Sequence, residues 1–248
     1  MKSFGLTDKG TVRAENQDCF IIEKCDKKQC LIVSLCDGMG GARSGGIASH
    51  LANKAFVSYV YGRLSSRNNR YSDIKSVLYD ACIEANALSY DYSKFDAEFT
   101  GMGTTLVGGI IYSNGEGKIV NVGDSRAYHI SRKTSEIYQV TRDHSLVEDL
   151  VSSGAITREE AKNHPQKNVI TRAVGSEEFV NPDYYEFTLL PGDVLLLCSD
   201  GLTNTVTDME LLDYAGEYYD AELLCRALMK KALNRGAKDN VTVVAVSR

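Results

Sequence analysis

The chain has 248 residues, of which 43% are hydrophobic and 25% charged, a composition typical of a folded globular protein. Its formal net charge of -5 argues against a nucleic-acid binder, because neutralising phosphates requires a basic surface. The 7 cysteines show no zinc-like spacing, and no stretch approaches the roughly 20 apolar residues of a membrane span. The first residues lack the apolar core of a signal peptide, so we expect a cytoplasmic protein with reduced thiols and no membrane partner.

The first elements are predicted to be two strands and two helices. Apolar stretches at 19–23 and 30–36 flank a charged turn and predict a hairpin that ends at Asp37. Three cysteines flank this turn, and we expect them to be exposed: Cys19, Cys25 and Cys30. A helix is predicted to start near Gly45, with an apolar repeat at every fourth residue: Ile47, Leu51 and Ala55. The next helix has a longer apolar face, formed by Ile74, Val77, Leu78, Ala81, Cys82, Ala85 and Leu88.

The middle of the chain predicts strands and then an insertion. The strands are expected at 104–112, 118–122, 126–130 and 136–141, with Asn114-Gly115 as the hairpin turn between the first two. The segment 145–180 changes character and contains two short helical patterns. The second starts at a capping box formed by Thr157 and Glu160 and ends by Pro165. We therefore expect a polar, helical insertion between strands.

The last third returns to strands and closes with two helices and a strand. Strand patterns occupy 184–189 and 193–198, and a capping box of Thr207 and Glu210 opens a helix. A further helix ends at Gly236, and a final strand follows at 241–246. Helices come in pairs without strict alternation with strands, which favours an α+β fold of two mainly antiparallel sheets covered by helices. No linker is evident, so we expect one domain over 1–248.

Short acidic motifs recur along nearly the whole chain. Asp37, Asp124 and Asp200 each follow a strand-like stretch, and Asp239 precedes one. The motifs are Glu15-Asn16-Gln17-Asp18, Asp37-Gly38-Met39-Gly40-Gly41, Gly123-Asp124-Ser125-Arg126, Ser199-Asp200-Gly201 and Lys238-Asp239-Asn240. A sheet can gather such carboxylates into one cup, where like charges stay ionised only with a counter-charge. Because all the side-chain donors are oxygens, Mg²⁺ or Mn²⁺ is favoured over zinc.

A cup of this kind is suited to chemistry at phosphorus. Two divalent ions acidify a water and hold the oxygens of a displacement at phosphorus. Glycine at position 38 frees the backbone to turn and lets its carbonyl approach a ligand. Arg13 lies just before the first acidic motif, and a guanidinium can make bidentate contacts with a phosphoryl group. Alone, each of these signals is weak; their joint occurrence indicates a two-metal hydrolytic site that acts at phosphorus.

In order and spacing, these residues resemble the metal-dependent Ser/Thr protein phosphatases of the 2C type, the PPM family, in their compact bacterial form. The resemblance spans about residues 5 to 246. It is carried by Arg13…Glu15-Asn16-Gln17-Asp18, Asp37-Gly38-Met39-Gly40-Gly41, Gly101-Met102-Gly103-Thr104-Thr105, Val122-Gly123-Asp124-Ser125-Arg126, Thr141-Arg142-Asp143-His144-Ser145, Ile170-Thr171-Arg172-Ala173-Val174-Gly175, Ser199-Asp200-Gly201-Leu202 and Asp239-Asn240-Val241-Thr242. It implies a four-layer αββα sandwich with metals at its edge, and a flap-like insertion at about 145–180.

The resemblance also implies roles for the acidic residues. Asp37 would bridge two metals, Mn²⁺ or Mg²⁺, and Gly38 would add its carbonyl oxygen. Asp200 and Asp239 would complete the ligand set of the first metal, partly through water. Asp18 would support the water network around the metals.

Further roles concern a possible third metal, the phosphate and the general acid. A third, weaker ion would lie between Asp124 and Asp200, and Arg13 would hold the substrate phosphate. Relatives place a histidine at the Met39 position or just after the double glycine, where this chain has Ala42. The pattern therefore leaves the general acid unassigned, with a metal-bound water as one alternative. His144 is interpreted as structural.

The implied activity is Mg²⁺- or Mn²⁺-dependent hydrolysis of phosphoserine and phosphothreonine in phosphoproteins by a metal-activated water. We expect a monomer that opposes a bacterial Ser/Thr kinase and acts on that kinase and its substrates. Two alternatives remain open: a dedicated phosphatase of an anti-sigma-type regulator, and a pseudophosphatase that serves as a binding module. The second alternative would be expected to lose metal ligands, yet Asp37, Asp200 and Asp239 are all present.

Overall fold

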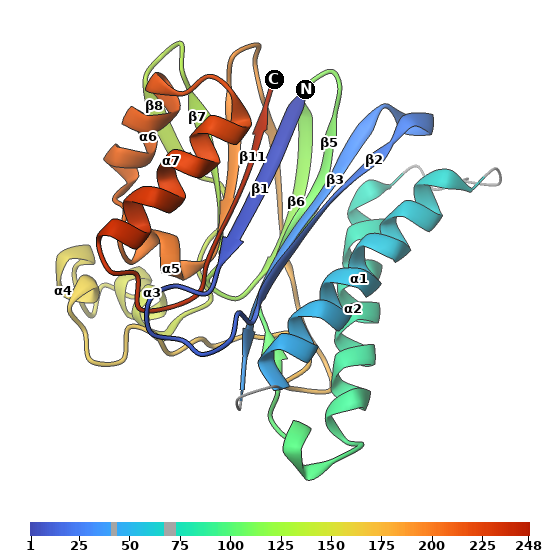
Figure 1. Cartoon of the computed structure of the whole chain (residues 1–248). Helices are drawn as coiled ribbons and strands as arrows, with labels where there is room; N and C mark the ends of the chain where they lie inside the picture. The colour runs from blue at the N-terminus through green and yellow to red at the C-terminus, as the bar shows by residue number, and fades with distance from the viewer. Residues whose placement is uncertain (41–43, 67–72) are drawn as a thin grey trace.

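Two antiparallel sheets face each other at the centre of the molecule, and a pair of helices covers the outer face of each (Figure 1). The structure is a computed structural model that describes residues 1–40, 44–66 and 73–248. The pairings between neighbouring strands in both sheets are antiparallel. The predicted α+β class and the four-layer αββα order are confirmed.

The first sheet has five strands in the order β1-β11-β10-β7-β8. Their bounds are Lys2–Asp8 (β1), Val241–Ser247 (β11), Val194–Cys198 (β10), Arg126–Ser131 (β7) and Glu136–Gln139 (β8). The sequence did not predict β1, because this edge strand is only partly buried and lacks a clear apolar alternation. Its pairing with β11, from Lys2↔Ser247 to Asp8↔Val241, joins the two ends of the chain.

The second sheet has the order β2-β3-β5-β6-β9, and a short strand, β4, extends the end of β3. The bounds are Asp18–Cys25 (β2), Cys30–Met39 (β3), Gly103–Thr104 (β4), Leu106–Tyr112 (β5), Glu116–Val122 (β6) and Asp183–Thr188 (β9). The hairpin of β2 and β3 ends at Asp37 as predicted, with Asp18 opposite Asp37 in the register. The strand continues to Met39 because β4 pairs with it, Gly38 opposite Thr104 and Met39 opposite Gly103.

Two long helices, α1 (Ser44–Ser65) and α2 (Ile74–Ser93), cover the second sheet. The buried stripe of α1 lies one residue away from the predicted one and contains Ala48, Ala52, Phe56, Val60 and Leu64. On α2 the predicted face is buried from Val77 to Ala85, whereas Ile74 is only half-buried and Leu88 is 45% exposed. A helix stripe about 100° wide leaves such boundary positions undecided by spacing alone.

The outer face of the first sheet is covered by α6 (Asp208–Glu217) and α7 (Ala221–Asn234). The Thr207 side chain accepts from the Glu210 amide and closes the predicted capping box. Gly236 ends the last helix with φ +71, as predicted. The sequence did not predict a short helix, α5 (Asp200–Thr203), which begins directly at an acidic residue.

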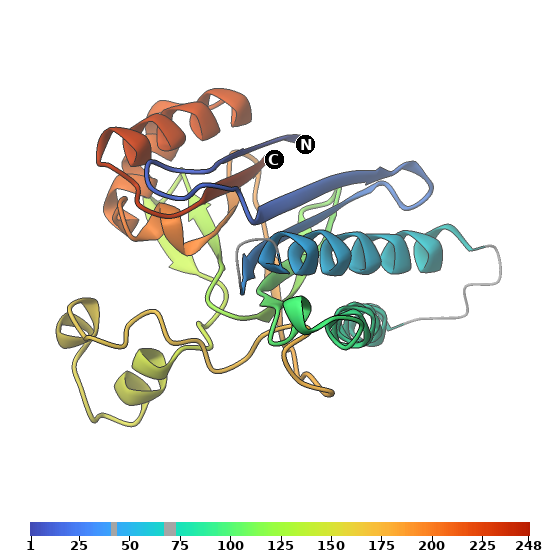
Figure 2. The same ribbon diagram turned by 60° about the horizontal axis from the view of Figure 1, so that its bottom comes forward.

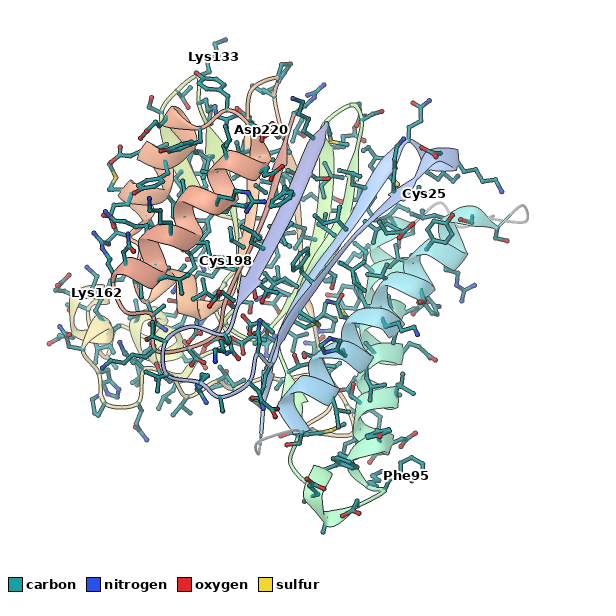
Figure 3. All side chains as sticks on the ribbon, viewed as in Figure 1. Cys25, Phe95, Lys133, Lys162, Cys198 and Asp220 are labelled. Atoms are coloured by element: carbon teal, nitrogen blue, oxygen red, sulfur yellow. The ribbon has the colours of Figure 1, made fainter. Side chains whose placement is uncertain are left out.

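The core between the two sheets follows the period of two expected of a strand buried on both faces. On β10, Leu195 and Leu197 point toward the second sheet, whereas Leu196 and Cys198 belong to the layer under α6 and α7. Cys198 lies in the interior of the molecule in Figure 3. The expectation of exposure was wrong for Cys25 and Cys30, which are 1% and 3% exposed beneath the end of α1.

The segment 145–180 contains the two predicted short helices, α3 (Leu146–Ser152) and α4 (Arg158–Lys162). They stand beside the sheets rather than on either outer face, which Figure 2 shows with the lower end of the molecule forward. The capping box at Thr157 and Glu160 is present. Within the described parts of the chain, no helix is long and apolar enough to cross a membrane.

Candidate metal centre

The acidic residues predicted as ligands come from both sheets. Asp18 begins β2 and lies opposite Asp37 of β3 in the strand register. Asp124 lies in the loop between β6 and β7, Asp200 begins α5, and Asp239 directly precedes β11. All four of the other carboxylates raise the pKa of Asp37, after its burial, which is the largest cause. The fold therefore gathers these charges into one electrostatic cluster, although their sequence positions span most of the chain.

Asp18 is the most deeply buried member of this cluster. Its Oδ2 accepts hydrogen bonds from Ser199 Oγ at 2.8 Å and Thr242 Oγ1 at 2.7 Å. Its Oδ1 is buried and accepts no hydrogen bond within the described residues. Burial raises the pKa of Asp18 to about 6, even though these two hydroxyls favour the ionised form. Only a cation, a water or a shared proton can satisfy an oxygen placed in this way.

The backbone of Asp37 is held by residues to which the sequence assigned no role. Its N–H donates to Thr105 Oγ1 at 2.9 Å, and its carbonyl accepts from Thr104 Oγ1 at 2.9 Å. The same carbonyl accepts from the Thr105 N–H at 2.9 Å. In the sequence these threonines appeared only within a motif that carries the resemblance, whereas the structure makes them positioning residues for Asp37. The sequence signal that could have revealed this role is the motif Gly101-Met102-Gly103-Thr104-Thr105.

Only glycine fits at position 38. A Cβ there would lie 2.1 Å from the carbonyl oxygen of Gly45 and 2.7 Å from that of Gln17. This close approach packs the start of α1 against the strand that carries Asp37. The predicted use of the Gly38 carbonyl is compatible with this crowding, since the missing side chain leaves the backbone accessible.

Asp124 and Asp200 interact with each other across the two sheets. Burial, followed by the Asp200 charge, raises the pKa of Asp124 to about 7. Burial, followed by the Asp239 charge, raises the pKa of Asp200. Asp200 Oδ2 accepts from Asn204 Nδ2 at 3.0 Å, one turn later in the chain. Such a group of mutually repelling carboxylates is the environment that a divalent cation stabilises.

Arg13 lies at the rim of the cluster and is engaged with Asp239. Its Nη2 donates to Asp239 Oδ2 at 2.8 Å, and this hydrogen bond is the main cause of the raised pKa of Arg13. Asp239 Oδ1 accepts from the backbone N–H of Asn240 at 2.8 Å. A guanidinium has five N–H donors, so one bond to Asp239 leaves others for a phosphate.

Asn240 is a residue whose role sequence reasoning missed. Its side chain accepts from the Gln17 N–H at 2.8 Å and donates to the carbonyls of Lys9 at 3.0 Å and Glu15 at 2.9 Å. These bonds hold the loop that carries Arg13 against the loop before β11, and the two loops run side by side in Figure 1. The only sequence signal was an amide next to a candidate ligand.

His144 has the structural surroundings that the sequence suggested. Its Nδ1 accepts from the Gly123 N–H at 3.2 Å, and its Nε2 lies 3.2 Å from Asp183 Oδ2. Burial lowers the pKa of His144, which favours the neutral ring. The ring thus ties the loop of Asp124 to β9. Ser125 is also structural, since its buried hydroxyl pairs with Thr105 Oγ1 at 2.8 Å.

The donor set fits a hard divalent cation, with part of the ligand set left to water. In residues 1–40, 44–66 and 73–248, no three Asp, Glu, His or Cys side chains converge closely enough to hold an ion by themselves. Arg13 donates a hydrogen bond to one oxygen of Asp239, and Asn204 donates one to an oxygen of Asp200. Carboxylate oxygens and the unpartnered Oδ1 of Asp18 still form a set suited to Mg²⁺ or Mn²⁺.

The general acid is not found among the expected positions. Met39, which stands where relatives have a histidine, is partly buried near Gly103 and Ser176. The prediction about Ala42, and with it Gly41 and Arg43, lies outside the described residues.

Comparison with known proteins agrees with this chemistry. The family model described as "Protein phosphatase 2C" matches residues 11–235. A serine/threonine phosphatase, stp, from Listeria welshimeri is 37% identical over 243 residues, covering 98% of this chain and 94% of that protein. The crystal structure of the phosphatase Stp1 from Staphylococcus aureus has a TM-score of 0.88 at 35% identity, covering 99% of this chain and 94% of that one.

A further structural neighbour bears on the metals. The catalytic domain of the Ser/Thr phosphatase PstP, solved in complex with 2 manganese ions, has a TM-score of 0.82 at 31% identity. The alignment covers 98% of this chain and 96% of that one. The family match, the extent of these alignments and the acidic cluster lead to one assignment. The chain belongs to the protein phosphatase 2C family of metal-dependent serine/threonine phosphatases.

Proposed function

We propose that this phosphatase uses two Mn²⁺ or Mg²⁺ ions, held by Asp37, the Gly38 carbonyl, Asp200 and Asp239. The observation that carries this proposal is the electrostatics of Asp37, whose pKa is raised by burial and by four neighbouring carboxylates. Such a cluster ionises fully only when cations are bound to it. Asp18 would orient waters through its free Oδ1, a role supported by the absence of a protein donor to that atom in the described residues.

The bound ions would supply the positive charge that acidifies a water and neutralises the phosphoryl oxygens. The residues of the chain do the rest. Arg13 would turn its remaining N–H donors to the phosphate and orient it for in-line displacement. Asp239 keeps Arg13 at the rim through their 2.8 Å bond. Asp124, together with Asp200, would hold a third and weaker ion, because burial beside another carboxylate disfavours its ionised form.

The substrates would be proteins phosphorylated on serine or threonine by a kinase of the same cell, and the kinase itself. We further propose that the chain works as a monomer in which residues 1–248 form one catalytic domain. A cytoplasmic location would agree with the chemistry of its thiols. All seven cysteines are free, which is typical of proteins in a reducing compartment.

A phosphatase assay with and without metal tests the proposal. The purified protein should hydrolyse p-nitrophenyl phosphate and a phosphothreonine peptide with Mn²⁺, and it should stop with EDTA. Asp37→Asn should abolish both reactions while the circular dichroism spectrum stays unchanged. Turnover that persists after complete removal of divalent cations would refute the mechanism.

A further inference from the structure

A segment next to the metal centre is fastened to it by main-chain bonds. The Thr104 N–H donates to the Val174 carbonyl at 2.9 Å, and the Val174 N–H donates back at 2.8 Å. Thr104 in turn pairs with Gly38, the residue after Asp37. The chain at Val174 is therefore the next neighbour, across β4, of the strand that carries the central carboxylate. A molecule that bound to the segment around Val174 would therefore lie close to the metal centre.

One buried side chain fastens the continuation of this segment to α2. Asn86 is 2% exposed and accepts from the Gly175 N–H at 2.8 Å. It also donates to the carbonyls of Glu177 at 3.1 Å and Glu178 at 3.0 Å. Three bonds from a single buried amide hold this stretch rigidly along the helix. In Figure 2 the chain that leaves α4 crosses the lower end of the molecule toward α2.

Two adjoining pockets flank this stretch, an outer one against α2 and an inner one toward Met39, and both have Phe179 and Val180 in their walls. The outer part has a volume of about 340 Å³ and is lined on α2 by Ile83, Ala87 and Tyr90. The inner part has a volume of about 280 Å³ and reaches Met39, two residues from Asp37, with walls that include Arg172. We name the two parts together the α2 groove.

The outer part of the α2 groove is apolar. Ile83, Ala87 and Tyr90 follow helical spacing on a face that is not directed at the sheet. Ile83 is 53% exposed and Phe179, on the opposite wall, is 83% exposed. Two large apolar side chains exposed across a groove are typical of a binding surface rather than of an ordinary solvated face.

The rim of the outer part is acidic. Lys94 lies over the Tyr90 ring at 3.8 Å and within 3.8 Å of the Asp91 carboxylate, so its charge is already partnered. Glu178 lines the outer part and Glu177 lines the inner part. Among the described residues, neither carboxylate forms an ion pair. An occupant with a basic residue beside an apolar one would match both the walls and the rim.

We propose that the α2 groove binds the stretch of a phosphoprotein substrate that flanks the phosphorylated residue. An apolar side chain of that stretch packs between Phe179 and Ile83, and an adjacent Lys or Arg lies by Glu178. Met39 lines the inner part and lies two residues from Asp37 on the same strand, and this position beside the metal centre favours the substrate over other occupants. This inference rests on the proposed function, since it assigns sequence preference to the same reaction.

A peptide series tests the proposal. Each peptide of the series contains one phosphothreonine among alanines and a single Leu-Lys pair. The position of this pair, before or after the phosphothreonine, changes from one peptide to the next. One position should raise kcat/KM about tenfold, the equivalent of about 1.4 kcal/mol, through KM. Phe179→Ala should remove this gain, and Glu178→Lys should remove the part due to the lysine. Leu223→Ala, an exposed apolar residue on α7, is the matched control and should retain it.

The outcomes distinguish a failure of the groove proposal from a failure of the proposed function. Turnover of p-nitrophenyl phosphate with Mn²⁺ should be equal in all these variants, because that substrate does not reach the groove. Equal turnover together with no preferred Leu-Lys position would overturn the groove assignment and leave the proposed function intact. Loss of turnover of every substrate in the parent protein would instead reject the proposed function. A dimer in sedimentation experiments that Phe179→Ala dissociates would identify a second copy as the occupant and overturn the substrate assignment.

Discussion

Arg13 and Asp239 form an ion pair at 2.8 Å between two loops separated by 226 residues in the chain. This contact makes one candidate metal ligand a partner of the candidate phosphate-binding residue. A cation at Asp239 and the guanidinium of Arg13 compete for the same carboxylate. Arg13 therefore has two functions that an experiment can separate. It would bind the phosphate of the substrate, and it bonds to Asp239, the candidate metal ligand.

Replacing Arg13 with alanine separates these functions. We expect Arg13→Ala to raise KM for a phosphothreonine peptide about tenfold, because the bidentate phosphate contact is lost. The apparent affinity for Mn²⁺ should stay equal or improve, since Asp239 is released from its partner. Steady-state kinetics over a Mn²⁺ titration would measure both quantities. Arg226→Ala, which removes a surface arginine paired with Glu222, should change neither; an unchanged KM for Arg13→Ala would exclude its phosphate role.

Replacing Asp239 with asparagine tests its role as a ligand. Asparagine preserves the shape and can still accept the Asn240 N–H, so the fold should be retained. The loss of charge should lower kcat by roughly 100-fold or more and weaken Mn²⁺ binding. Isothermal titration with Mn²⁺ and a turnover assay check this expectation. Asp213→Asn, on the exposed face of α6, is the control and should change neither quantity. Near-normal Mn²⁺ affinity in Asp239→Asn would remove Asp239 from the ligand set.

The stability of the metal-free protein should depend on pH in a defined direction. Burial raises the pKa of Asp18 to about 6 and that of Asp124 to about 7, so the folded state binds protons more tightly than the unfolded chain does. This contribution to stability is complete below about pH 4, where both states are protonated, and is lost as pH rises through 6 to 7. In EDTA, Tm should therefore fall between about pH 4 and pH 7.

Divalent cations should reverse this trend. They bind the ionised carboxylates, so the rise in Tm caused by Mn²⁺ should grow over the same pH window. Differential scanning calorimetry at several pH values, with EDTA or Mn²⁺, measures both effects. Asp18→Asn should make Tm in EDTA depend less on pH, because the asparagine side chain does not titrate. An EDTA profile identical in the parent protein and in this variant would show that Asp18 does not contribute.

The ion pair of Arg126 and the buried Asp143 should contribute more to the free energy of unfolding than an exposed ion pair does. Three hydrogen bonds of 2.7–3.0 Å join the guanidinium to this carboxylate, which is 8% exposed. Asp143→Ala leaves the Arg126 guanidinium, whose side chain is only 28% exposed, without its carboxylate and should cost about 3 kcal/mol in the free energy of unfolding. Urea denaturation measures this loss. Glu222→Ala, which removes the exposed ion pair with Arg226, should lower the free energy of unfolding by less than about 1 kcal/mol. Equal losses in the two variants would contradict the larger contribution of the Arg126–Asp143 pair.

The loop that carries Arg13 should depend on Asn240. Asn240→Ala removes three hydrogen bonds to this loop and should lower the free energy of unfolding by about 1–3 kcal/mol. It should also raise KM for phosphopeptides, because Arg13 is no longer held at the rim. Urea denaturation and peptide kinetics check the two effects. A loss of stability with an unchanged KM would confine Asn240 to a structural role.

Much of the fold could be predicted because local physics dictates it. The capping boxes at Thr157 and Thr207, and the helix end at Gly236, lie where the sequence placed them, since each depends only on neighbouring backbone groups. The strand β1 could not be predicted in this way. Its stability comes from pairing with β11 at the far end of the chain, and a half-exposed edge strand carries little pattern of its own.

For the site, the sequence by itself determined the residue types: oxygen ligands that suit a hard cation, a glycine beside Asp37 and an arginine for phosphate. Tertiary structure alone decided their partners. Arg13 pairs with Asp239, Asn240 fastens the Arg13 loop, and Thr104 holds the backbone of Asp37. The reason is physical. Ligand chemistry is a property of each side chain, whereas contacts between residues far apart in the chain exist only after the two sheets have packed.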